Sequence, residues 1–431
     1  MTAAAVANAA PAPSRAAFVG WCSYDWANSA FAAIIVTFVF PTYFSQLVAG
    51  PGSEGAAQWG WALGASGVAV ALAAPLIGAI ADRTGRLKPW VGGLTLAAAL
   101  LTAALWFVRP QESDVLRALV LVALADIAIE LATVFYNALL PRLAPAHLLG
   151  RLSGWGWAAG YAGGLVALVL CLTLLIKADP PPGFLDVATA EPIRATAVLT
   201  ALWLLVFSLP LFLFVREPRG PGAPIGQAVA SGWTQLKGSL RSALGHGPML
   251  QFLIARMLYT DGLAALFAFG GLFAAERFAF RIDEVLMLGI LLNVTGAVGA
   301  AAFGWIDDRI GPKPTILIAL AGLISLGAAA LVIDDKIAFW WIAGALGLFV
   351  GPAQSASRSL MARIVPPGLE AEMFGLFALS GKATAFLAPF AFSAATALTG
   401  DIRWGMATIL AFLAAGFAVL APLKMARPAG R

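Results

Sequence analysis

Apolar residues fill most of the chain in long runs, and polar residues gather in short stretches between these runs. The runs are long enough for membrane helices, which need about 20 residues, and far longer than barrel strands of about 10. The pattern predicts an all-α integral membrane protein with twelve transmembrane helices. The predicted spans are Phe18–Leu47, Gln58–Ala81, Trp90–Val108, Val115–Leu140, Leu149–Ile176, Ala195–Val215, Met249–Ala275, Val285–Ile306, Thr315–Ile333, Ala338–Ile364, Met373–Leu398 and Trp404–Leu423.

Composition agrees with a bilayer protein. Hydrophobic residues make up 61% of the chain and charged residues 11%, whereas a soluble domain is about half apolar and about a quarter charged. The net charge of +5 does not indicate nucleic-acid binding, because membrane proteins collect Lys and Arg on cytoplasmic loops. With both termini in the cytoplasm, the inner loops carry about twice as many basic residues as the outer loops, so we expect this orientation.

The longest polar stretch divides six predicted spans from six. The expected organisation is a disordered cytoplasmic tail (1–17), a six-helix bundle (18–216), a cytoplasmic linker (217–248), a second six-helix bundle (249–424) and a short tail (425–431). Within the linker, apolar residues recur at three- and four-residue steps, at Ile225, Val229, Trp233, Leu236 and Leu240. This spacing is typical of an amphipathic helix on the inner leaflet, and a plain linker with some helix is the alternative.

A charged loop motif occurs twice, half a chain apart. The first copy contains Gly78, Asp82, Arg83, Gly85, Arg86 and Lys88, and the second contains Gly304, Asp308, Arg309 and Gly311. Each copy reads as a helix end, a glycine turn and a helix start, so the chain is predicted to be a duplicated six-helix unit. An aspartate at such a turn can bind arginine side chains or the partly positive start of another helix. The alternative is that these loops only set topology through their bases.

A short list of polar side chains falls inside the predicted spans. It comprises Tyr24, Asp25, Asn28, Asp126, Glu130, Arg256, Tyr259, Asp261, Gln354, Arg358 and Lys382. A charge at mid-bilayer costs at least ~2.5–3.5 kcal/mol and is usually functional or paired. The four acids and three bases form a nearly neutral set, which a dry cavity can tolerate. These residues are the candidate substrate- and proton-binding groups.

Asp126 and Glu130 lie four residues apart, so they share one helix face. Two acids on one face repel each other unless one is protonated, which suits a proton carrier. The alternative is a structural ion pair with Arg358 or Lys382.

Other members of the set have structural alternatives too. Asp25 lies near a helix start and could cap that helix, and Arg256 could pair with Asp261. Arg358 could extend to the inner membrane surface.

Enzymatic chemistry has no support in the sequence. We find no nucleophile–base set, no metal-ligand spacing, no phosphate loop and no dinucleotide fingerprint. No catalytic residue, metal or cofactor is therefore expected, and a proton gradient is the expected energy source.

Several of these motifs resemble a known family. The loop G-x-x-x-D-R-x-G-R-x-K resembles the signature loop of the major facilitator superfamily. Ser23–Phe31, Gly160–Gly164, Gln354–Ser359 and Phe374–Lys382 look like segments of its autophagy-related vacuole-effluxer branch. The resemblance implies that Asp82 contacts the start of the eleventh helix in an outward-open state, and that Asp308 faces the start of the fifth. Members of this branch are described as effluxers, some of which export amino acids from vacuoles.

The resulting hypothesis is a monomeric secondary transporter that moves a small polar or zwitterionic solute by alternating access. Efflux coupled to protons, through a bacterial plasma membrane, is the expected activity. The amino group or the proton would bind Asp25, Asn28, Asp126 and Glu130, and the carboxylate would bind Gln354, Arg358 and Lys382.

Two alternatives stay open. A cation-coupled sugar carrier of the melibiose type fits the acids of the first and fourth helices and the lysine of the eleventh, but the second helix lacks the acidic pair expected for sodium. A non-transporting receptor or scaffold is the alternative of another class.

Overall fold

The computed structural model describes residues 13–50, 53–178, 182–183, 185–217, 222–234 and 247–424. In these ranges all regular structure is helical, and twelve helices are long and apolar enough to cross a membrane. The predicted all-α class with twelve candidate spans is confirmed.

The helices follow the predicted order. In the first half they are α1 (Arg15–Ala30), continued by η2 (Phe31–Phe38), α2 (Phe40–Tyr43) and η3 (Phe44–Val48), then α3 (Ser53–Thr84), α4 (Lys88–Ala104), α5 (Val115–Leu143), α6 (Leu149–Cys171) with η7 (Leu172–Ile176), and α7 (Glu191–Phe214). In the second half they are α9 (Gly247–Phe278), α10 (Ile282–Ile310), α11 (Pro312–Val332), α12 (Lys336–Ile364), α13 (Glu370–Lys382), α14 (Leu387–Thr399) and α15 (Ile402–Leu420).

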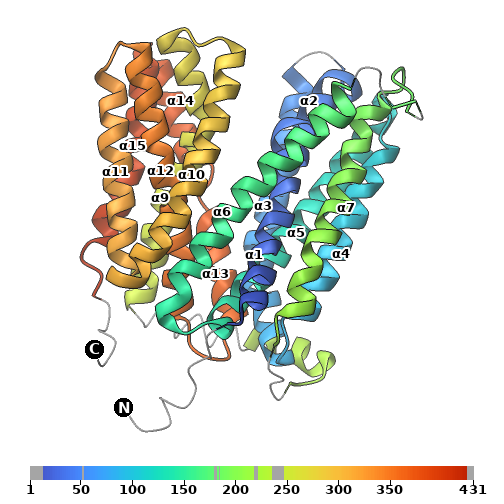
Figure 1. Ribbon diagram of the computed structural model, residues 1–431, viewed down its shortest axis with the longest axis vertical. Helices are drawn as coiled ribbons and strands as arrows, with labels where there is room; N and C mark the ends of the chain where they lie inside the picture. The colour runs from blue at the N-terminus through green and yellow to red at the C-terminus, as the bar shows by residue number, and fades with distance from the viewer. Residues whose placement is uncertain are drawn as a thin grey trace.

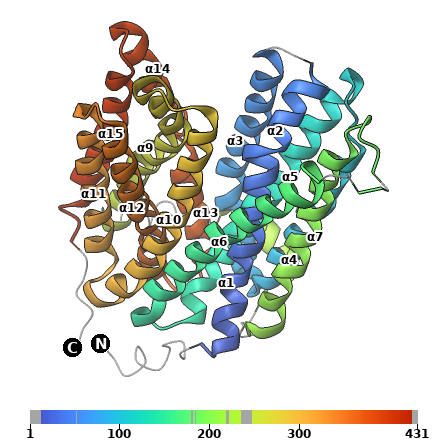
Figure 2. The same cartoon turned by 45° about the horizontal axis from the view of Figure 1, so that its top comes forward.

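The helices form two groups side by side (Figure 1). Helices α1 to α7 make the first bundle, and α9 to α15 make the second. The start of α1 and the end of α15 lie at the same end of the molecule, which we call the terminal end; the opposite end is the far end. The groups meet at the terminal end and diverge toward the far end, as the turned view in Figure 2 also shows.

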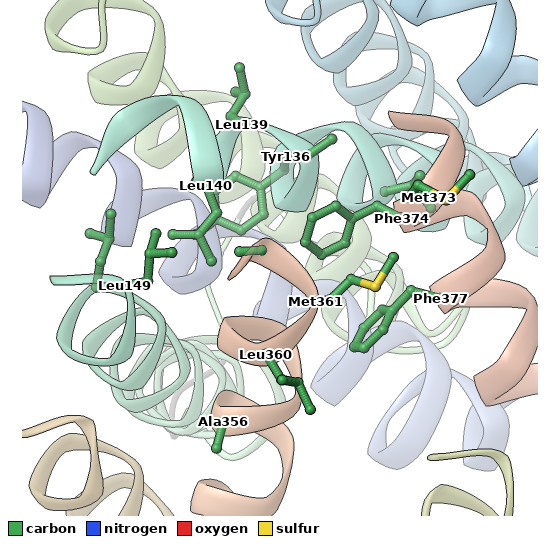
Figure 3. Close-up of a cluster of buried hydrophobic side chains, with 14 of the residues drawn as sticks. Tyr136, Leu139, Leu140, Leu149, Ala356, Leu360, Met361, Met373, Phe374 and Phe377 are labelled. Atoms are coloured by element: carbon green, nitrogen blue, oxygen red, sulfur yellow. The ribbon is translucent and has the colours of Figure 1, made fainter. Parts of the chain in front are cut away.

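The hydrophobic cores follow the same division. One core is shared between the bundles at the terminal end, where Tyr136, Leu140 and Leu149 of the first bundle lie in the same cluster as Leu360 and Phe374 of the second (Figure 3). Two further cores each stay within a single bundle. Apolar packing therefore joins the bundles at the terminal end, and the other two cores hold each bundle together.

Glycines allow the bundles to approach closely at this end. Helix α3 packs against α13, and α6 packs against α10. A Cβ atom on Gly78 would lie 2.8 Å from the Cα of Glu372, and one on Gly304 would lie 3.0 Å from the carbonyl oxygen of Gly150. Small residues of this kind let helix backbones meet in membrane proteins.

The two predicted glycine turns have a specific backbone geometry. Gly85 between α3 and α4 has φ +72°, and Gly311 between α10 and α11 has φ +95°. Glycine adopts such angles without the steric cost that other residues incur. Both copies of the loop therefore turn at a glycine with a positive φ, but three residues separate the helices in the first copy and Gly311 alone separates them in the second.

The predicted eleventh span is interrupted in the structure. The sequence predicts one helix over Met373–Leu398, but α13 ends at Lys382 and α14 starts at Leu387. Pro389 lies in the first turn of α14. Proline lacks an N–H group and its ring clashes with the carbonyl four residues earlier, so a regular helix cannot continue through this point without distortion.

Part of the predicted linker is visible. Residues 225–234 are helical, and Ile225, Val229 and Trp233 are exposed on this helix while Ala228 is buried. The remaining predicted apolar positions, Leu236 and Leu240, lie outside the described residues. Residues 1–12 of the expected first tail and residues 425–431 of the expected second tail also lie outside the described residues. Helix α1 starts at Arg15, so the last positions of the expected first tail are helical.

Candidate functional site

A partly exposed ion pair links the bundles near the middle of the molecule. Lys382 Nζ at the end of α13 lies 3.3 Å from Glu130 Oε1 on α5, and the two side chains retain 26% and 37% of their exposed surface. Asp126, one turn earlier on α5, is buried and accepts a hydrogen bond of 2.5 Å from Ser66 Oγ on α3. The structure thus brings together three residues that the sequence marked as candidates.

The net charge of the cluster formed by Asp126, Glu130 and Lys382 follows from its composition. With all three side chains ionised it carries one net negative charge, since it contains two carboxylates and one ammonium. Both side chains of the Glu130–Lys382 pair are partly exposed, so the pair is not sealed within the packed helices. Such a pair can exchange its internal contact for contacts with the ammonium and carboxylate of a zwitterion, and one proton on the cluster makes it neutral.

Asp25 and Arg358 form a second, buried ion pair between the bundles. Arg358 Nη1 on α12 lies 2.9 Å from Asp25 Oδ2 on α1, and Tyr136 on α5 donates to the same oxygen at 3.0 Å. Because α1 starts at Arg15 with Ser14 as its cap, Asp25 lies within the helix and does not cap it. Arg358 is only 4% exposed and does not extend to a membrane surface. Both structural alternatives considered for these two residues are therefore wrong.

The other contacts of Arg358 also come from the first bundle. Ser153 on α6 accepts from Nε through its hydroxyl at 2.9 Å and from Nη2 through its carbonyl at 2.8 Å. Asn137 Oδ1 on α5 accepts from Nη1 at 3.2 Å. The guanidinium carbon lies 4.7 Å from the ring centre of Trp21 and 5.8 Å from that of Trp157. In this conformation Arg358 belongs to an inter-bundle contact and does not join Lys382.

Arg256 and Asp261 on α9 bind the two halves of the interrupted span. Arg256 Nη1 donates to the carbonyl of Phe377 at 2.5 Å and to Ser380 Oγ at 2.8 Å, next to the end of α13. Asp261 Oδ2 accepts from the backbone N–H of Ala388 at 3.2 Å, in the first turn of α14. They do not form an ion pair with each other, so the pairing considered from the sequence is wrong for this conformation. Instead, one residue binds near each side of the break.

The remaining candidates inside the spans are two tyrosines and two amide residues. The hydroxyl of Tyr24 lies 2.7 Å from Thr95 Oγ1 on α4, and that of Tyr259 lies 2.6 Å from Ser357 Oγ on α12. Both tyrosines are fully buried and connect neighbouring helices, so the structure does not bring them to the Asp126–Glu130–Lys382 cluster. Asn28 and Gln354 are half-buried.

Asp82 connects the end of α3 to the start of α13. Its two carboxylate oxygens accept from the backbone N–H groups of Ala371 at 3.0 Å and Glu372 at 2.8 Å. Arg142, in the last turn of α5, lies 3.6 Å from Asp82 and 2.8 Å from Glu370. A carboxylate here binds the partly positive helix start, and we call this contact the first latch.

Asp308 makes the equivalent contact in the other half. Its carboxylate accepts from the backbone N–H groups of Gly150 at 2.8 Å and Arg151 at 3.3 Å, at the start of α6. The side chain of Arg151 adds a contact of 2.7 Å. Arg363 in the last turn of α12 lies 2.8 Å from Asp307 and 3.4 Å from Asp308. This second latch repeats the first with the roles of the bundles exchanged.

The basic residues of the loops divide into two kinds. Lys88 Nζ donates to the carbonyls of Phe212 at 2.9 Å and Val215 at 2.6 Å, at the partly negative end of α7. Arg83, Arg86 and Arg309 are exposed. Lys88 thus fixes the loop to its own bundle, and the exposed arginines face the surroundings.

Sequence reasoning gave no functional role to several residues that the structure places in these contacts. They are Ser66, Tyr136, Asn137, Arg142, Ser153, Glu370 and Arg363. Arg142 and Arg363 had a usable signal, since each lies in the last turn of corresponding spans, the fourth and the tenth. The hydroxyl and amide residues carried no such signal, because a single Ser, Asn or Tyr in a membrane helix can bond to any neighbouring helix.

No metal centre is evident among the described residues, where no group of three or more His, Cys, Asp or Glu side chains is placed to hold an ion. Two pockets in this part of the chain, of about 660 and 60 Å³, lie against α7 and inside the second bundle. Their lining residues carry no charge, so we place the candidate site at the ionised cluster and not in these pockets.

Comparison with known proteins agrees with the geometry. The family profile described as vacuole effluxer Atg22 like matches residues 62–429. The MFS-type transporter YxiO of Bacillus subtilis is 24% identical over 404 residues, which cover 93% of each chain. Autophagy-related protein 22 of Coccidioides immitis is 26% identical over 288 residues, covering 60% of this chain and 46% of that protein, so this chain matches about half of the fungal protein's length.

Among solved structures, the MFS transporter FucP in its outward conformation matches 96% of this chain and 100% of its own, with a TM-score of 0.75 and 14% identity. A likeness at that identity shows a shared fold.

Proposed function

Because this chain belongs to the Atg22-like vacuole effluxer family of the major facilitator superfamily, we propose that it exports a small zwitterionic solute of the amino-acid type, driven by protons. Family membership makes it a multi-pass membrane transporter and not an enzyme. The solute, the direction of flux and the coupling ion are the parts we propose.

The observation that carries the proposal is the accessible Glu130–Lys382 pair between the bundles. Lys382 binds the solute carboxylate and Glu130 binds its ammonium group. Asp126, one helical turn away, takes the proton that removes the excess negative charge of the cluster. A neutral site costs less to enclose than a charged one. After the solute has left, the protonated empty site is therefore favoured on the return step, and the proton enters in exchange for the exported solute.

The conformation supports alternating access. The shared core, both latches and the Asp25–Arg358 pair join the bundles at the terminal end. The far end has separate cores. With the terminal end in the cytoplasm of a bacterial plasma membrane, this is an outward-facing state, and the opposite state requires these contacts to separate. The expected monomer contains the complete site.

The test is flux in liposomes containing the purified chain, with an imposed pH gradient and a panel of amino acids and glycosides. We expect amino-acid flux that follows the gradient, loss of its gradient dependence in Asp126→Asn, and loss of the flux itself in Glu130→Gln. Asp283→Asn removes an exposed acid outside the cluster and is the matched control. Gradient-driven flux that persists in both cluster variants would exclude the proposed coupling, and flux of glycosides alone would favour the sugar carrier.

A further inference from the structure

The groups that hold Arg358 form a complete receptor for a guanidinium ion. We call Trp21, Asp25, Tyr136, Asn137, Ser153 and Trp157 the cation cage. Every member lies on α1, α5 or α6 of the first bundle, whereas the guanidinium they surround comes from α12 of the second. One bundle therefore supplies the receptor and the other supplies its occupant.

The cage matches a guanidinium more closely than an ammonium. Nε, Nη1 and Nη2 of Arg358 each donate to an oxygen of the cage, at distances of 2.8 to 3.2 Å. The rings of Trp21, Tyr136 and Trp157 have their centres within 4.7 to 5.8 Å of the guanidinium carbon. A planar fork of donors that also contacts aromatic rings is the particular chemistry of guanidinium, and an ammonium ion has a tetrahedral set of three donors.

Arg358 cannot remain in the cage when the terminal end opens. Within the described part of the chain, Asp25 and Arg358 form ion pairs only with each other. Separation of the bundles would leave Asp25 as a poorly exposed carboxylate without its cation, which is strongly unfavourable. The empty cage would then face the terminal end with its oxygen acceptors and aromatic rings still in place.

We infer that in this opposite state the cage binds a solute that carries a guanidinium group, such as an arginine-like amino acid. The inference rests on the alternating access proposed above. Solute and Arg358 compete for one carboxylate, so a filled cage and a closed terminal end exclude each other. The terminal end can then close only after the solute has left the cage, so a filled cage holds the terminal end open.

Ethylguanidinium tests the cage directly, because it has the atoms that Arg358→Ala removes beyond Cβ. Binding to the purified variant is measured by calorimetry, with ethylammonium at equal concentration as the matched cation. We expect ethylguanidinium to bind Arg358→Ala at least tenfold more tightly than it binds Asp25→Asn/Arg358→Ala, and more tightly than ethylammonium does. Arg358→Met keeps the cage filled by a neutral chain and is expected to bind neither ion.

Equal binding of both ions, or ethylguanidinium binding that is the same with and without Asp25, would overturn the inference. If Arg358→Ala folds only when an ion is added, the yield of folded protein with each ion becomes the measured quantity. Rescue by ethylguanidinium but not ethylammonium supports the cage, and rescue by both or neither overturns it. If ethylguanidinium does not bind but proton-driven amino-acid flux is intact, the cage is refuted and the proposed function stands. If ethylguanidinium binds as expected but no amino-acid flux is found, only the proposed function is refuted.

Discussion

The first latch provides the most direct test of how the terminal end is closed. Asp82→Asn keeps the size of the side chain but removes its charge and replaces one acceptor oxygen by an NH₂ group. The native carboxylate accepts from two backbone N–H groups, at 3.0 and 2.8 Å. In the variant, one of these N–H groups faces a donor, so one hydrogen bond is lost and the other is weakened.

The expected magnitude follows from these contacts. A hydrogen bond to a charged group contributes roughly 1.5–3 kcal/mol. The latch forms only when the terminal end is closed and the far end is open. Its loss therefore destabilises this state and leaves the stability of the opposite state unchanged. With 1.4 kcal/mol for each factor of ten, the ratio of the two states should shift by about 10- to 150-fold toward the terminal-end-open state.

The shift can be followed by distances between spin labels at the far end. Suitable positions are Glu112→Cys in the first bundle and Val332→Cys in the second, which are both exposed, while Cys22 and Cys171 are buried. Asp82→Asn should add a population with a shorter distance between these labels, and Asp283→Asn should not. If the distance distribution of Asp82→Asn matches that of the parent while the protein stays folded, the latch does not set the balance between states.

Three further changes have expected outcomes. Gly78→Ala places a Cβ atom against the backbone of Ala371 and should shorten the same far-end distance, whereas Gly93→Ala, with no atom within 4 Å, should leave it unchanged. Asp261→Ala removes the contact with the first turn of α14 and should lower the free energy of unfolding by about 1 kcal/mol. Thermal unfolding in detergent measures this change. An unchanged Tm would argue against a capping role for Asp261. Lys382→Gln should raise the KM for amino-acid flux in liposomes far more than Lys382→Arg does, because only the arginine keeps the positive charge, and equal KM values would remove Lys382 from the site.

The charged motifs and their positions could be found from sequence because the bilayer imposes strict rules. Apolar runs of membrane length can only be helices or barrel strands, and the repeated loop marks the duplication. Asp126 and Glu130 were expected to share a face from their spacing alone, and their association with Lys382 was among the alternatives. The partners of Asp25, Arg256 and Asp261 were not predictable, because these contacts join residues 121 to 333 positions apart. They depend on how the two bundles pack against each other for Asp25, and on how the helices pack within the second bundle for Arg256 and Asp261.

Sequence alone therefore determined the class of this protein, its twelve candidate spans, its family and the small set of ionised groups inside the membrane. These features depend on local hydrophobicity and on motifs that are contiguous in the chain. Tertiary structure decided which charges meet: Glu130 with Lys382 in an accessible pair, Asp25 with Arg358 in a buried one, and Asp261 with the first turn of α14. The physical reason is that each such contact joins helices far apart in sequence, and only the packed bundles bring the two groups within hydrogen-bonding distance while excluding the other possible partners.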